Sequence, residues 1–232
     1  AMGHRVVVFE REKTAGGVPV YGIPSFKYSK ERVAQIVERV RARGVEVRCG
    51  VEADQDVRSQ GFDAVLVAIG ASKGLRPDVP GVDLPGVWLA TDFLVAANLP
   101  AHLHQKRAPS GRSCVVIGGG DTSTDCARSA LRLGFESVVV AYRRSEAEMP
   151  GRKDDRVYAI DEGARYEFLA SPVRFLGDAC VEKVVLQRMT LGEPGSDGRR
   201  RPIAVLGSEF EIDADVVVLA DVTYRHLHHA AL

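Results

Sequence analysis

Short apolar runs alternate with amphipathic stretches along the chain, and their spacing predicts an α/β fold. Runs rich in Val, Ile and Leu and of strand length lie at residues 5–10, 45–48, 64–68, 87–89, 114–117, 137–142, 165–169, 181–189, 203–206 and 216–220. Apolar positions at helical spacing predict helices at about residues 30–43, 91–98, 121–133 and 153–162. Strands that alternate with helices indicate parallel sheets with helices on both faces, as in Rossmann-like folds.

A polar stretch at residues 100–112, which contains Pro109 and Gly111, is the best internal linker. The predicted parts are therefore residues 1–108, residues 109–220 and an atypical C-terminal tail, 221–232. Within the second part, residues 192–201 are hydrophilic and end in three successive arginines. We expect this stretch to be a solvated hairpin tip rather than a binding patch.

Composition narrows the possible partners. Lys plus Arg and Asp plus Glu number 31 each, so no overall charge favours nucleic acid or an anionic membrane. The four cysteines lie far apart without a C-x-x-C spacing, which argues against a zinc or iron-sulfur site in this chain. The apolar runs are too short to span a bilayer, and the first residues do not read as a signal peptide. A cytoplasmic location is the expectation.

A glycine-rich turn stands between the apolar strand at 114–117 and the helix that follows it. It reads Gly118, Gly119, Gly120, Asp121, Thr122, Ser123. Glycines allow a tight turn and bring backbone N–H groups close to a pyrophosphate, whose charge the helix N-terminus favours. Ser123 replaces the third small residue of the usual fingerprint. An ordinary strand-to-helix turn is the alternative interpretation.

The end of the next strand predicts which dinucleotide binds. A basic residue there can receive the 2′-phosphate of NADPH, whereas an acid would bind the free ribose of NADH. The chain has Arg143 and Arg144 at this place, with Arg152 as a weaker third candidate. NADPH is therefore favoured. The alternative is that Arg143 and Arg144 are a solvated surface pair. The first strand ends instead on an acid, Glu10, as expected where the dinucleotide is FAD, whose ribose carries no 2′-phosphate.

Four stretches match the motifs of a known family in the same order along the chain: residues 16–27, 67–71, 118–125 and 142–150. Together they closely resemble the small subunit of NADPH-dependent glutamate synthase and its relatives, including the flavin and NADPH domains of dihydropyrimidine dehydrogenase. The match runs from about residue 4 to residue 220. It implies two interleaved dinucleotide-binding domains of the flavoprotein disulfide reductase type. It also implies hydride transfer from NADPH to FAD, and electrons that leave through iron-sulfur clusters to a partner subunit or domain.

The resemblance also assigns residues to the flavin. The matching positions are Glu10 and Arg11 near the FAD ribose, Gly16, Gly17, Val18 and Lys27 along the pyrophosphate and isoalloxazine side, Val51 near adenine, and Ala68 and Gly70 where backbone passes the nucleotide. Residues 1–108 would then be a partial FAD-binding domain and residues 109–220 the NADPH-binding domain. No side chain is expected to act as a catalytic acid or base, because the cofactors supply the chemistry.

The chain also departs from the family's pattern. The glycine fingerprint that precedes a residue like Glu10 in the family has no counterpart here, and residues 221–232 do not match the family's continuation. We therefore expect a chain truncated at both ends, with an incomplete FAD domain that could have lost its flavin and could self-associate. A flavin-free NADPH-binding or assembly module is one rival function. A structural remnant that binds no nucleotide is the other.

Overall fold

The computed structural model describes residues 3–53, 55–70, 74, 76–104, 107–196 and 198–220. Two compact units are present: residues 1–71 with 98–105, and residues 72–97 with those from 106 onward. The tail expected to be atypical, 221–232, lies outside the described residues. The predicted boundary near residue 108 separates an FAD-binding part from an NADPH-binding part, and it stays a prediction.

The second unit is built on a five-stranded parallel sheet in the order β3-β10-β4-β5-β6. Its strands are β3 (Val87–Leu89), β10 (Val216–Leu219), β4 (Ser113–Ile117), β5 (Ser137–Tyr142) and β6 (Arg165–Phe168). Each of them begins and ends within one or two residues of its predicted range. Because β4 and β10 have hydrogen-bonded neighbours on both sides and layers on both faces, almost every residue in them is buried.

Helices cover one face of this sheet. They are α3 (Ala90–Asn98), α4 (Asp121–Arg132) and α5 (Lys153–Asp161), with the 3-10 turn η3 (Glu146–Glu148) before α5. Their small and apolar residues pack against alternate residues of the parallel strands, among them Val116, Val140 and Val218, all fully buried. The close approach of α4 to the sheet follows from its alanines and its cysteine, which are completely buried.

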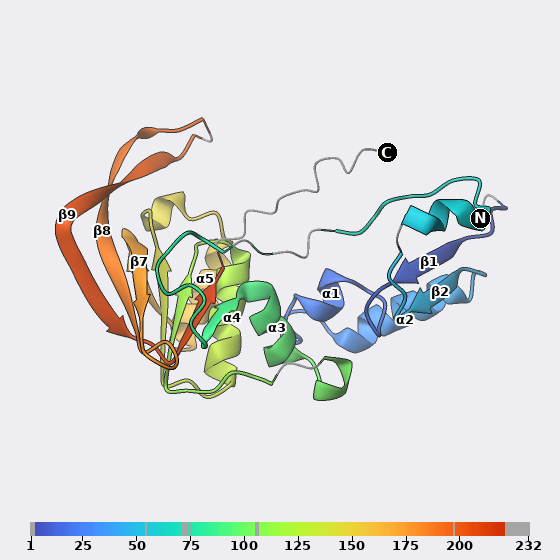
Figure 1. The fold of residues 1–232 in the computed structure, drawn as a ribbon, viewed down its shortest axis with the longest axis horizontal. Helices are drawn as coiled ribbons and strands as arrows, with labels where there is room; N and C mark the ends of the chain where they lie inside the picture. The colour runs from blue at the N-terminus through green and yellow to red at the C-terminus, as the bar shows by residue number, and fades with distance from the viewer. Residues whose placement is uncertain are drawn as a thin grey trace. The chain divides into compact units, whose positions relative to one another are not determined.

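A three-stranded antiparallel sheet, in the order β7-β8-β9, covers the other face (Figure 1). Its strands are β7 (Ala170–Leu176), β8 (Lys183–Pro194) and β9 (Arg200–Asp213). Val184 and Leu186 of β8 pack with Val115 and Val217 of the parallel sheet. The sequence indicated strands inside β8 and β9 but not β7, whose charged and polar residues hide its period. The hairpin tip predicted within residues 192–201 is confirmed at residues 195–199.

The first unit is smaller and its strands are half-exposed. It contains β1 (Val7–Glu10) parallel to β2 (Glu46–Cys49), the helices α1 (Val18–Tyr21) and α2 (Lys30–Arg41), and the 3-10 turns η1 (Gln55–Gln60) and η2 (Ala101–Leu103). The predicted helix and both strands are confirmed, and Ser29 caps α2 by accepting a hydrogen bond from the Arg32 amide at 3.3 Å.

The strand predicted at residues 64–68 is wrong. These residues are described without regular secondary structure, and Leu66 is 90% exposed. Apolar β-branched residues favour a strand only where a neighbouring strand satisfies their backbone groups. In the described part of the first unit the sheet holds only β1 and β2. Over the ranges that the structure describes, no helix is long and apolar enough to cross a membrane.

Candidate functional site

The turn after β4 has a backbone that requires glycine at two positions. Gly118 has φ +148°, in a region that other residues rarely adopt, and its amide donates to the Ala141 carbonyl at 3.0 Å. A Cβ on Gly119 would lie 2.4 Å from the ring of Tyr142. The turn is therefore held against the end of β5, where a dinucleotide's adenosine would lie.

The start of α4 is partly exposed. Gly120 is its N-cap, no side chain caps the helix, and a Cβ on Gly120 would meet nothing within 4 Å. Ser123 is fully buried and its hydroxyl donates to the Gly120 carbonyl at 2.6 Å. The first-turn amides of Asp121 and Thr122 follow this uncapped position. Such a helix start attracts an anion through its N–H groups and its dipole.

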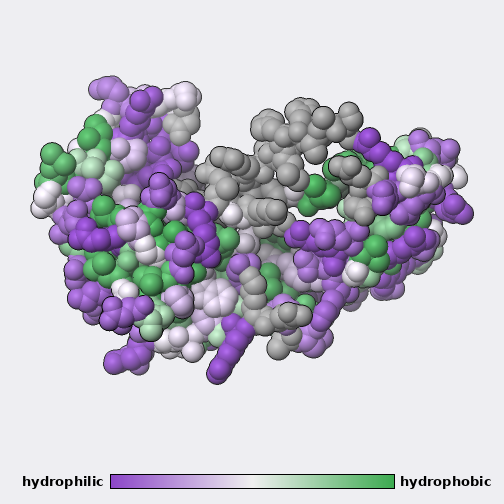
Figure 2. Space-filling model, viewed as in Figure 1, coloured by the Kyte–Doolittle hydropathy of each residue, from purple (hydrophilic) through white to green (hydrophobic). Residues whose placement is uncertain are grey.

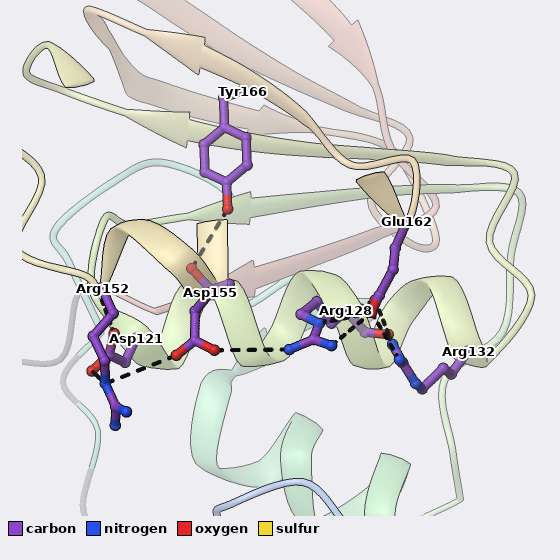
Figure 3. A network of polar contacts seen from close by, with 8 residues as sticks. Asp121, Arg128, Arg132, Arg152, Asp155, Glu162 and Tyr166 are labelled. Atoms are coloured by element: carbon purple, nitrogen blue, oxygen red, sulfur yellow. Dashed lines mark hydrogen bonds and ion pairs between the residues drawn. The ribbon is translucent and has the colours of Figure 1, made fainter. Parts of the chain in front are cut away.

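A second loop closes on the same turn. The Gly151 amide donates to the Gly119 carbonyl at 3.1 Å, and a Cβ on Gly151 would be only 3.1 Å from that oxygen. The Arg152 amide donates to Asp121 Oδ1 at 2.7 Å, and Arg152 Nε lies 3.5 Å from Oδ2 (Figure 3). Arg152, with 74% of its side chain exposed, therefore lies beside the helix start, whereas the sequence proposed it as a weaker third candidate for the 2′-phosphate.

The two arginines after β5 differ in their surroundings. Arg143 is exposed, whereas Arg144 is only 8% exposed and donates from Nε to the Arg200 carbonyl at 2.8 Å. The Arg144 carbonyl also accepts from the Leu169 amide at 3.1 Å. Sequence reasoning treated the pair as equivalent. The structure gives Arg144 a second task, since it ties the end of β5 to the antiparallel sheet.

The turn after Arg144 is fixed by a network around Glu148. The Glu148 carboxylate accepts from the Ser145 hydroxyl and pairs with Arg200 of β9. Those two partners hold the pKa of Glu148 below its usual range, with the Ser145 hydrogen bond as the larger cause. The Tyr142 hydroxyl donates to the Glu148 carbonyl at 2.9 Å. Arg200 belongs to the basic run that we expected to be solvated, and its contact with Glu148 could not be seen from local sequence.

Ion pairs join α4 to α5 and to Glu162, the residue that follows α5 (Figure 3). Glu162 accepts from Arg128 and Arg132, each with a contact of 2.6 Å. The Arg132 and Arg128 guanidinium groups lower the pKa of Glu162 to about 2. Asp155 lies 3.9 Å from Arg128 and also 3.9 Å from Arg152, so the network reaches the loop beside the glycine turn. Its role is to hold that loop and the helix start together.

Two cysteines lie in the core rather than at a reactive site. Cys114 of β4 and Cys126 of α4 are free thiols with no exposed surface, and burial raises the pKa of both well above the ordinary thiol value. Such thiols are inert. Among the residues that can be placed, no group of three or more His, Cys, Asp or Glu side chains could hold a metal ion.

The flavin candidates lie in the first unit. The Glu10 carboxylate accepts from the Glu12 amide at 3.0 Å, and Glu10 and Val51 are joined by a 3.0 Å backbone hydrogen bond. Arg11 lies in the same turn and pairs with Glu12 at 3.2 Å. The ends of β1 and β2 thus bring together Glu10, Arg11 and Val51, the three residues expected near the adenosine of FAD.

The remaining flavin candidates are dispersed over loops and turns. Gly16 has φ +135° and is packed so closely that a Cβ would lie 2.6 Å from Val20. Gly17, the N-cap of α1, precedes the exposed Val18. Lys27 is half-buried. Ala68 and Gly70 are exposed and lie in the stretch without regular secondary structure.

Comparison with known proteins identifies the family of the chain. A family model described as pyridine nucleotide-disulphide oxidoreductase matches residues 3–221. The chain is 40% identical over 233 residues to the putative oxidoreductase AegA of Escherichia coli (strain K12), covering 94% of this chain and 35% of that protein. It is 40% identical over 232 residues to the glutamate synthase (NADPH) small chain of Halomonas elongata, covering 94% of this chain and 48% of that one.

A solved structure has the same fold. Mycobacterium tuberculosis FprA in complex with NADPH superimposes with a TM-score of 0.82 at 22% identity, covering 98% of this chain and 66% of that one. The chain belongs to the pyridine nucleotide-disulphide oxidoreductase family. The resemblance to the glutamate synthase small chain is confirmed, as is the α/β fold class. The chain spans about a third to a half of the length of the two curated relatives.

Proposed function

We propose that this chain is an NADPH-binding oxidoreductase module, similar to the glutamate synthase small chain, that passes hydride from NADPH to FAD. The observation that carries this proposal is the uncapped, glycine-lined start of α4 next to the arginine turn after β5. A diphosphate needs backbone amides at a helix start, and the 2′-phosphate needs guanidinium groups one strand away. Both are present, so the residues of the second unit fit NADPH.

Each part of this site has a defined task. Gly118 and Gly119 keep the backbone close to Tyr142, and the amides from Gly120 to Thr122 face the diphosphate. Arg143 offers a guanidinium fork to the adenosine 2′-phosphate, while Arg152 adds positive charge at the helix start. NADPH, when bound, supplies the hydride, so the chain's residues orient and hold rather than exchange protons.

The flavin half of the proposal rests on the first unit. Glu10 offers a carboxylate to ribose hydroxyls, and Val51 offers backbone beside it. Gly16, Gly17, Val18 and Lys27, and also Ala68 and Gly70, are proposed along the rest of FAD by the family match. Electrons would then pass to an iron-sulfur partner, a role suggested by the relative whose name calls it a small chain.

A flavin-free NADPH-binding module is a second candidate function. It is favoured by the exposure of Ala68 and Gly70, which lie in a stretch without regular secondary structure. The absorbance spectrum of the purified chain separates the two functions. Flavin bands near 450 nm, about the wavelength common to protein flavins, would support the hydride-transfer module. Colourless protein that still binds NADPH would support the flavin-free module.

Titration of the full chain with NADPH and with NADH tests the nucleotide site. The wild type should prefer NADPH, and Arg143→Ala should weaken NADPH binding about tenfold or more, since a charged hydrogen bond is lost. NADH binding should change little. Arg174→Ala is the matched control, because Arg174 pairs with Glu209 on the antiparallel sheet and carries the same charge. Equal affinity of the wild type for both nucleotides would overturn the assignment.

A further inference from the structure

The hairpin between β8 and β9 contacts the arginine turn that follows β5. Arg144 Nε donates to the Arg200 carbonyl at 2.8 Å, although 56 residues separate them in the chain. The Arg200 guanidinium in turn pairs with Glu148, which lies at the other end of that turn. The first residue of β9 is thus attached to both ends of the segment on which the proposed 2′-phosphate site depends.

Glu148 holds the Arg200 side chain in a defined place. Only 9% of the Glu148 side chain is exposed, and it also accepts from the Ser145 hydroxyl, while the Glu148 carbonyl accepts from Tyr142. The Ser145 and Arg200 contacts lower the pKa of Glu148, so it is ionised at neutral pH. A fixed negative partner orients the long Arg200 side chain, 48% of which remains exposed to a ligand.

Three guanidinium groups belong to this turn or contact it. Arg143 and Arg144 lie on the turn, and Arg200 pairs with Glu148 beside it. Glu146, the other acid of the turn, pairs with the buried Arg156 at 2.9 Å. A phosphate monoester carries a charge of about −1.5 to −2 at neutral pH and offers three acceptor oxygens to guanidinium donors.

We infer that Arg200, contributed by the antiparallel hairpin, is a third guanidinium of the adenosine 2′-phosphate site and determines the preference for NADPH over NADH. This inference rests on the proposed function. Arg143 and Arg144 approach the phosphate from the end of β5, and Arg200 approaches it from β9. Glu148 keeps Arg200 extended over the turn before the nucleotide arrives.

The contacts of Arg200 allow its side chain to be tested alone. Arg144 is held by the Arg200 backbone carbonyl, which Arg200→Ala retains, so the substitution leaves the Arg144 contact in place. Arg201→Ala is the matched control: it removes the same charge one residue further along. The contacts of Arg144 and Glu148 with β9 run through Arg200 and not through Arg201.

The experiment measures the affinity of the full 232-residue chain for NADPH, NADH, 2′,5′-ADP and 5′-ADP. Arg200→Ala should weaken the binding of NADPH and 2′,5′-ADP about tenfold or more, the usual effect of losing a charged hydrogen bond. The affinities for NADH and 5′-ADP should change less than about twofold. Arg200→Lys should recover part of the loss, and Arg201→Ala should match the wild type. An unchanged preference, or an equal loss for all four ligands, would overturn the role of Arg200.

The same titrations separate this inference from the proposed function. A wild type that does not prefer NADPH and 2′,5′-ADP refutes both. If the wild type prefers them, Arg143→Ala loses the preference and Arg200→Ala keeps it, only the role of Arg200 is refuted. Thermal unfolding of each variant accompanies the titrations, and an Arg200→Ala chain that unfolds like Arg201→Ala shows that any loss of affinity comes from the ligand contact.

Discussion

The two units place similar apolar sequences in very different surroundings. In the second unit Val115 and Val116 of β4 lie between two neighbouring strands and between two layers, and both are fully buried. In the first unit Val8 of β1, also in a run of valines, is 40% exposed. Figure 2 shows green hydrophobic side chains among purple ones on the surface of both units. The chain's own contacts therefore fix the nucleotide turn of the second unit far more firmly than the flavin residues of the first.

The largest expected effect comes from emptying the helix-covered core of the second unit. Phe93 of α3 is completely buried, and Phe93→Ala should lower the free energy of unfolding by about 3–5 kcal/mol. Phe9 of β1 is half-buried beside Phe62, so Phe9→Ala should cost less than about half of that. Hydrogen exchange resolved by segment measures both, with slower exchange for β4 than for β1 in the wild type. Equal costs would remove the contrast between the units.

A carboxylate that fastens β4 to β10 should have the next largest effect. Asp215 accepts from the Arg112 amide at 2.6 Å, and from the Ser113 amide and hydroxyl at 2.8 and 3.0 Å. Asp215→Ala should cost about 2–3 kcal/mol because it leaves these donors without their partner. Denaturation followed by the fluorescence of Trp88, the chain's single tryptophan, reports on this unit. A cost below about 0.5 kcal/mol would contradict the role of Asp215.

The pH dependence of that contact has a definite sign. Hydrogen bonds, first of all from the Ser113 amide, lower the pKa of Asp215 from 3.8. A carboxyl group with a lowered pKa stabilises the fold above its ordinary pKa and loses that stabilisation as pH falls through the lowered value. The difference in stability between wild type and Asp215→Ala should therefore shrink below about pH 4. A difference that grows on acidification would contradict this sign.

The glycine turn offers a pair of matched substitutions. A Cβ at Gly119 would meet the Tyr142 ring at 2.4 Å, so Gly119→Ala should cost about 1–3 kcal/mol through overpacking. A Cβ at Gly120 would meet open space, and the φ of Gly120, −90°, suits alanine. Gly120→Ala should therefore cost less than Gly119→Ala, about 0.5 kcal/mol, because only the weaker N-cap preference of alanine opposes it. Thermal unfolding compares the two, and equal costs would show that the turn is not packed against Tyr142.

The ion pairs between α4 and α5 should have the smallest effect. Glu162→Gln should cost about 1 kcal/mol, because Arg132 is partly exposed and solvent weakens its attraction. The pKa of Glu162 is lowered from 4.5 to about 2, so this stabilisation is present above pH 4.5 and is lost between pH 4.5 and 2. Denaturant unfolding of wild type and variant across that window measures it. A variant as stable as the wild type at pH 7 would show that the pair contributes nothing.

The sequence predicted the second unit better than the first for a physical reason. Strands such as Cys114–Ile117 and helices such as Asp121–Leu133 are encoded by local apolar periodicity together with glycine turns, and they formed where expected. Residues 64–68 have the same composition as a strand, but pairing is a non-local property that composition does not encode. The candidate site likewise has a part that local sequence encodes and a part that depends on distant residues. The glycine turn was visible in the sequence, whereas the contacts of Arg144 and Glu148 with Arg200 depend on a hairpin far away in the chain.

A crystal structure of the full chain with NADPH tests the central claim most directly. We predict a diphosphate at the backbone amides of residues 119–122, and a 2′-phosphate held by guanidinium groups at the end of β5. Density for the diphosphate elsewhere on the chain, or a 2′-phosphate that points away from Arg143 and Arg144 into solvent, would contradict it.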